Sequence, residues 1–215
     1  MIAAVPAGGY VLLRAAAEAY AGGAPPNPDP TPAYTLTPPR TVEDGGPTLS
    51  GDLSDTFQRV TGPGPTAVAG RHDDGSGDEE LPYLGHHGDT GGSEAPEERP
   101  LDDTEGASSL SVAVPRRDIT PAGSDEPLTC EVLIRSEDGE EHTIPLCARG
   151  DAGAMGSVAD NSLDAFAHAP EDVDLDAFAE RVSGIRDEVC GPVGRPRPLS
   201  AAGPADRAGR RRGWW

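Results

Sequence analysis

Large apolar side chains are scarce in this chain, and that scarcity limits most strongly what it can fold into. Leucine, isoleucine, valine and phenylalanine together number 36 of 215 residues, against 28 glycines and 23 prolines. With a formal net charge of −20, so few large apolar groups cannot offset the conformational entropy that the whole chain would lose on folding. We therefore expect one local core, with the remainder of the chain largely disordered.

The charged residues are strongly unbalanced. Aspartate and glutamate number 37, whereas all 17 basic residues other than histidine are arginines. Such a composition is typical of GC-rich coding sequences, and it is also typical of halophilic proteins. At 1 M salt the Debye length falls to about 3 Å, so repulsion between carboxylates is screened while the charge keeps the protein soluble. Salt adaptation and genome composition alone both remain open as explanations.

The amino-terminal half divides into short segments of contrasting composition. Apolar residues recur at helical spacing between Leu49 and Val60, which predicts an amphipathic helix that either packs on a folded unit or binds a partner. Runs rich in proline, glycine or acidic residues flank it and predict segments without a packed core. The expected order is a short helix within 1–23, a Pro/Gly-rich connector over 24–48, the amphipathic helix over 49–60 and an acidic disordered linker over 61–108.

Residues 109–190 carry the pattern of a small α+β domain. Alternating apolar residues predict a strand from Leu110 to Val114, and residues 128–148 are typical of a β-hairpin. The fold class we expect is therefore a small C-terminal unit, in which this hairpin and one further strand are packed by one or two helices.

The register of the hairpin follows from which pairing keeps the apolar residues of both strands on one face. A three-residue loop satisfies this condition and places Val132 opposite Ile144 and Cys130 opposite Leu146. A two-residue turn would place Cys130 opposite Cys147 but would mix the two faces. The first register is preferred, and it argues against a disulfide between the two cysteines.

The helices of the domain are predicted from caps and periodicity. A short helix begins near Leu163, capped by Asn161 or Ser162, and a new turn starts at Pro170. Asp172 or Asp174 caps a longer helix that ends before the Gly-Pro at 191–192. Its apolar residues form one seam, which is either a core stripe or the interface of a homodimer, and which supplies the candidate partner-binding residues Leu175, Phe178, Val182, Ile185 and Val189.

The segment 191–215 is predicted to be a basic disordered tail. Its arginines could neutralise phosphates of nucleic acid or contact an anionic lipid surface, but contact with the acidic linker is favoured because the whole chain is acidic. The candidate anion-binding residues are Arg207, Arg210, Arg211 and Arg212.

No motif in the sequence predicts catalysis, a cofactor or a metal site. Cys130, His142 and Cys147 lack the short paired spacing of zinc ligands, and the negative end of a helix dipole would disfavour the thiolate of Cys190. The odd cysteine count and the lack of an apolar stretch of about 20 residues predict a cytoplasmic protein without a membrane span.

These observations favour a non-enzymatic regulatory or protein-interaction protein with an unknown protein partner. The alternative is a nucleic-acid-associated accessory protein that uses the C-terminal arginines.

Overall fold

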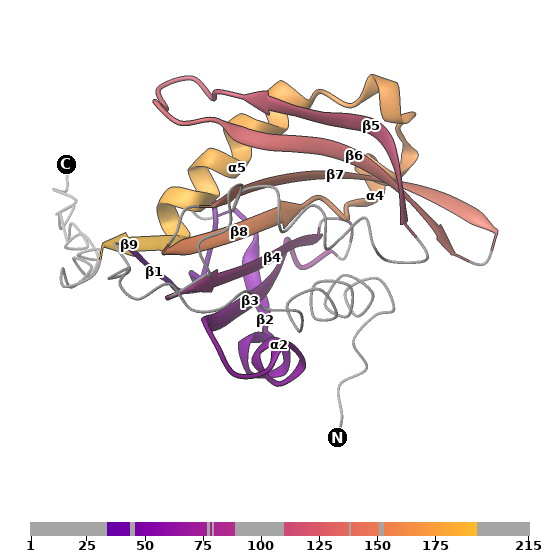
Figure 1. Ribbon diagram of the computed structural model, residues 1–215. Helices are drawn as coiled ribbons and strands as arrows, with labels where there is room; N and C mark the ends of the chain where they lie inside the picture. The colour runs from indigo at the N-terminus through magenta and orange to yellow at the C-terminus, as the bar shows by residue number, and fades with distance from the viewer. Residues whose placement is uncertain are drawn as a thin grey trace, which may run out of the picture.

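The computed structural model describes residues 34–43, 46–76, 78, 80–88, 110–137, 139–150 and 153–192. These residues are mostly β-structure, with nine strands in two antiparallel sheets and three α-helices (Figure 1). The strands are β1 (Tyr34–Leu36), β2 (Thr48–Asp52), β3 (Thr66–Asp73), β4 (Glu80–His87), β5 (Leu110–Ile119), β6 (Leu128–Glu137), β7 (Glu140–Gly150), β8 (Ala154–Ala159) and β9 (Cys190–Pro192). The helices are α2 (Ser54–Thr61), α4 (Leu163–Ala167) and α5 (Leu175–Val189), with a 3-10 turn, η1, at Pro170–Asp172.

The expected fold class, a small C-terminal α+β unit in a largely disordered chain, is wrong. The main sheet has seven strands in the order β2-β3-β4-β8-β7-β6-β5, so three of them precede the expected domain. Strand β4 pairs with β8, and Tyr83 lies opposite Val158. Strands β3 and β4 bury Ala67 and Ala69 as well as the larger Val68, Leu81 and Tyr83. The acidic and glycine-rich residues around them led to the prediction of a linker.

Both faces of the central strands β6 and β7 are buried. One face packs against α5 through residues that include Cys130, Val132 and Cys147. The opposite face carries Leu133, Ile144, Leu146 and Ala148, against which Phe166 of α4 packs. Figure 1 shows α5 running across the sheet toward the β1–β9 pair, with α2 beside β2 and β3.

The helices that follow β8 confirm the predictions made from caps. The Ser162 hydroxyl accepts a hydrogen bond from the Ala165 amide at 3.1 Å, and the Asp174 carboxylate accepts one from the Ala177 amide at 3.0 Å. Proline starts the 3-10 turn between the two helices, as expected. All five residues of the apolar seam are buried, so the periodicity of α5 is that of a core stripe: Leu175, Phe178, Val182, Ile185 and Val189.

The amphipathic helix expected at 49–60 is only partly correct. Leu49 belongs to β2, and the helix begins at Ser54. Phe57 is buried against Ala67 and Ala69 of β3, whereas Val60 is exposed. The helix therefore packs on the sheet through a narrower stripe than its sequence suggested.

The predicted hairpin register is also wrong. The strands are joined through the two-residue turn, so that Glu137 lies opposite Glu140 and Val132 opposite Pro145. Cys130 lies opposite Cys147, and the two form a disulfide. The prediction assumed that only one face would be buried, but burial of both faces removes the cost of distributing apolar side chains between them.

The disulfide also removes an argument about location. The odd total of three cysteines was one reason to expect a reducing compartment without disulfides, but two of the three form a disulfide. The cytoplasmic location therefore stays a prediction. No helix in the described part of the chain is long and apolar enough to cross a membrane.

Several predicted segments lie outside the described residues. They are the short helix within 1–23, the first part of the 24–48 connector, residues 89–108 of the linker predicted over 61–108, and the basic tail from residue 193 onward.

The disulfide should contribute measurably to stability. It joins residues 17 positions apart, and closing a loop of that size is worth about 3 kcal/mol. Replacing both Cys130 and Cys147 by alanine should lower the free energy of unfolding by about this amount in a urea titration followed by circular dichroism. Reduction of the wild-type protein should have a similar effect, whereas Cys190→Ala should change little. Equal urea midpoints for the oxidised and reduced protein would contradict the prediction.

Candidate functional site

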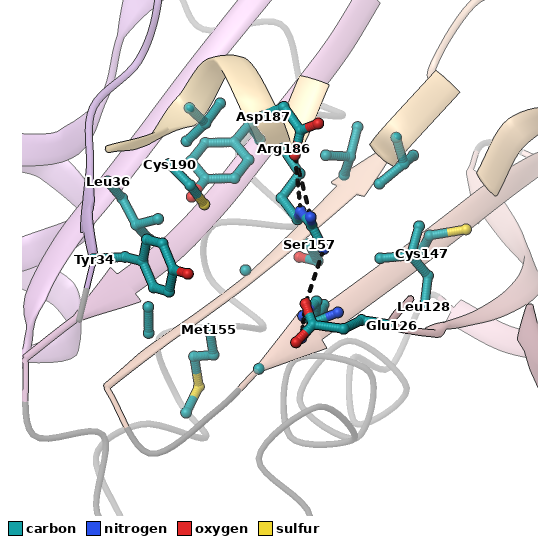
Figure 2. A pocket seen from close by; sticks show the side chains of 18 residues that line it. Tyr34, Leu36, Glu126, Leu128, Cys147, Met155, Ser157, Arg186, Asp187 and Cys190 are labelled. Carbon is teal, nitrogen blue, oxygen red and sulfur yellow. Dashed lines mark hydrogen bonds and ion pairs between the residues drawn. The ribbon is translucent and has the colours of Figure 1, made fainter. Parts of the chain in front are cut away.

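A cavity of about 340 Å³ lies between the C-terminal half of α5, the β1–β9 pair and the main sheet. Figure 2 shows its walls, with Tyr34 and Leu36 on one side and Leu128 and Cys147 on the other. The lining is drawn from strands β1, β4, β6, β7, β8 and β9, from helix α5 and from the loop before β6. Its residues are Tyr34, Leu36, Tyr83, Glu126, Leu128, Cys147, Arg149, Gly150, Ala154, Met155, Gly156, Ser157, Val158, Val182, Arg186, Asp187, Val189 and Cys190.

Two glycines shape the sheet at this cavity. Gly85 of β4 lies directly opposite Gly156 of β8. A Cβ atom at Gly85 would lie 2.5 Å from the Tyr83 hydroxyl oxygen and 2.8 Å from a Leu36 methyl carbon, and one at Gly156 would lie 3.2 Å from the Tyr83 hydroxyl oxygen. The bare backbone therefore lets the Tyr83 ring lie over the strands and lets β1 approach the sheet.

Strand β1 forms one wall and is held in place mainly by backbone groups. It pairs antiparallel with β9, and Leu36 lies opposite Cys190. The Leu36 amide donates to His87 Nδ1 at 3.3 Å, and the Thr37 amide donates to the Val189 carbonyl at 3.1 Å. Partial burial lowers the pKa of His87, because desolvation disfavours the charged imidazolium. The neutral ring is the form that can accept the Leu36 hydrogen bond.

Helix α5, the opposite wall, is fixed by an ion-pair cluster on its outer side. Arg181 donates to both carboxylate oxygens of Glu43, at 2.6 and 2.9 Å, and lies 3.4 Å from Asp160. These contacts join α5 to the loop before β2 and to the segment that follows β8. The position of the helix over the sheet is thus fixed independently of the cavity.

Charged side chains gather at the mouth of the cavity. Glu126 forms an ion pair with Arg149 and lies 3.6 Å from Arg186, which also bonds Asp187 at 3.2 Å. Figure 2 shows Glu126 and Arg186 approaching each other across the opening. The Nη1 nitrogen of Arg149 is buried and has no hydrogen-bond partner among the described residues. The site therefore combines an apolar interior with one unsatisfied cationic donor.

The structure places the predicted site residues in different surroundings. Val182 and Val189 of the α5 seam line the cavity, whereas the other three seam residues lie in the core. All five are buried, so this conformation does not present them to a protein partner. The candidate anion-binding residues Arg207, Arg210, Arg211 and Arg212 lie outside the described residues.

The three residues that were considered as metal ligands, Cys130, His142 and Cys147, make other interactions in the structure. Cys130 and Cys147 are joined in the disulfide, and the His142 ring packs against Phe166 with their centroids 4.8 Å apart. Across the described ranges, no group of three or more histidine, cysteine or acidic residues is placed to hold a metal ion.

We found no match between this chain and any protein-family model, curated protein or solved structure. The cavity is therefore the feature that bears most directly on the function of this protein.

The close packing around Gly85 gives a stability prediction with a matched control. Gly85→Ala should lower the free energy of unfolding by about 1–3 kcal/mol, because the new methyl group would overlap Tyr83 and Leu36. Gly184→Ala on α5 meets no atom within 4 Å and should instead raise stability by up to about 1 kcal/mol, since alanine is the better helix former. Thermal melts of the two variants would test this. A Gly85→Ala variant as stable as the wild type would show that the space around Gly85 is not tightly packed.

His87 should make the β1 wall sensitive to acid. The pKa of His87 is lowered in the folded protein, so the unfolded chain binds protons more readily. The stability that the neutral His87 ring contributes is therefore lost as pH falls below about 6.5, the pKa of an unperturbed histidine. His87→Asn keeps an acceptor for the Leu36 amide but does not titrate. Urea midpoints measured between about pH 7 and pH 5 should fall less steeply for this variant. Identical pH profiles for the two proteins would contradict the assignment.

Proposed function

We propose that this chain is a non-enzymatic regulatory protein that binds a small, largely apolar ligand in the cavity beneath α5. The observation that carries the proposal is the cavity itself, which has about 340 Å³ of space and a lining that is more apolar than polar, with charged groups at its mouth. Pockets of this size and character are the usual sites for small organic molecules. The charged groups at the mouth are arranged as ion pairs, which supports binding more than acid–base chemistry.

The placement of the cavity supports a regulatory role. Its β1–β9 wall consists of two strands of three residues each, and a two-stranded ribbon of that length is marginal without further packing. Tyr34 at the start of β1 and Pro192 at the end of β9 are the first and last residues that the structure describes. A ligand that packs against β1 and β9 would stabilise the two strands through which residues 1–33 and 193–215 are joined to the described structure.

The role in protein interaction stays a prediction, and strand addition to the main sheet is disfavoured as its mode. Edge strand β5 has two irregularities in its pairing and carries Pro115, Arg116 and Arg117, while β2 is short and also irregular. Such features block the edges of natural sheets against other chains. The nucleic-acid alternative depends on arginines outside the described residues, and no observation here favours it.

Filling part of the cavity should weaken ligand binding without unfolding the protein. Ala154 lines the cavity, and Ala154→Leu adds three carbon atoms to that space. If they displace a similar part of the ligand, affinity for a neutral apolar dye such as Nile red should fall by about thirtyfold, or roughly 2 kcal/mol. Binding would be measured by fluorescence titration, alongside circular dichroism to verify folding.

Ala177→Leu provides the matched control, because it makes the same change at an exposed position on α5. It should leave dye affinity unchanged. If the wild-type protein does not bind the dye, or if both variants bind it like the wild type, the cavity is not the binding site.

A further inference from the structure

The mouth of the cavity contains a cationic group that the protein satisfies only in part. Arg149 comes from β7 and lines the cavity, and its side chain is 24% exposed. Its guanidinium contacts Glu126, yet Nη1 is buried without a hydrogen-bond partner in the described part of the chain. A buried donor of this kind is costly to leave unmet. Because Nη1 is not accessible in this conformation, an acceptor from outside would reach the guanidinium only by taking the position of Glu126.

Glu126 occupies the position that such an acceptor would take. Its carboxylate lies between Arg149 and Arg186, and its side chain is 56% exposed to solvent. Its backbone is fixed separately, because the Ser124 hydroxyl bonds both the amide and the carbonyl of Glu126. The side chain alone can therefore move into solvent while the loop keeps its conformation.

The charge at the mouth determines what can replace Glu126. Two arginines, Arg149 and Arg186, are opposed by two carboxylates, those of Glu126 and Asp187. Withdrawal of Glu126 leaves one positive charge to be neutralised. A single carboxylate fits that requirement, whereas a dianion would exceed it in a chain that already carries a net charge of −20.

We infer that the ligand is a small amphipathic carboxylate. This inference rests on the proposed function and specifies its ligand class. The carboxylate replaces Glu126 between Arg149 and Arg186, where the planar guanidinium groups match its geometry, and the apolar body lies among Leu36, Val182 and Val189.

The test compares three probes that share one apolar chain and differ in the head group: octanoate, octanol and octylamine. Each is titrated into the full-length protein at neutral pH and constant ionic strength by calorimetry. Octanoate should bind about tenfold more tightly than octanol, because it gains charge-assisted hydrogen bonds, and octylamine should bind most weakly. The preference should decrease as salt concentration rises.

Two substitutions locate the head group. Glu126→Gln removes the internal competitor and should strengthen octanoate binding severalfold, whereas Arg149→Gln should weaken it by about tenfold. Neither change should alter octanol affinity. The matched controls are Glu180→Gln and Arg117→Gln, which change exposed residues away from the cavity.

The outcomes separate this inference from the proposed function. Equal affinities for octanoate and octanol, or a preference for octylamine, would overturn the carboxylate assignment while supporting the cavity as a binding site. If none of the three probes binds, the proposed function fails as well. The comparison of head groups on the wild-type protein does not depend on how well any variant folds.

Discussion

The structure depends on the burial of strands β6 and β7 on both faces. Helix α5 covers one face, where Cys130 and Cys147 lie, and α4 contributes to covering the other, where Leu133 and Ile144 lie. With both faces covered, these strands do not need the alternation of apolar and polar residues that a half-exposed sheet requires. The remaining strands extend the sheet outward from this hairpin on either side. Because α5 is held over one face, the space at its C-terminal end becomes the cavity.

Features that depend on local sequence could be predicted, whereas features that depend on distant packing could not. The caps Ser162 and Asp174 and the seam of α5 are recognisable from a few neighbouring residues, and they are confirmed. The hairpin register depends on whether the second face is covered, which residues 128–148 do not reveal. Strands β3 and β4 were missed for a related reason, because their few large apolar residues, Val68, Leu81 and Tyr83, lie among acidic residues and glycines and are buried only by distant parts of the chain.

The candidate site was even harder to predict from the sequence, because it depends entirely on packing between distant segments. Tyr34, Tyr83, Arg149 and Arg186 line the cavity, come from four separate elements and are distant in sequence. Gly85 looks like a linker residue in a glycine-rich chain, and its role is visible only when it lies opposite Gly156. Only Val182 and Val189 were among the predicted site residues, and they were chosen for helical periodicity. Proximity to a cavity carries no periodic pattern, so neither hydrophobic spacing nor motif searches could identify the other residues.

The cavity borders the two-stranded sheet of β1 and β9. The two strands β1 and β9 have little stability of their own, and β1 depends on the hydrogen bond from the Leu36 amide to His87 and on burial of the Leu36 side chain. Elements with few stabilising contacts open more readily than the core does. A ligand in the cavity would bind the closed arrangement of β1 and β9 preferentially and would therefore increase its population. Since Tyr34 and Pro192 join residues 1–33 and 193–215 to the described structure, occupancy of the cavity would determine how firmly these two positions are held.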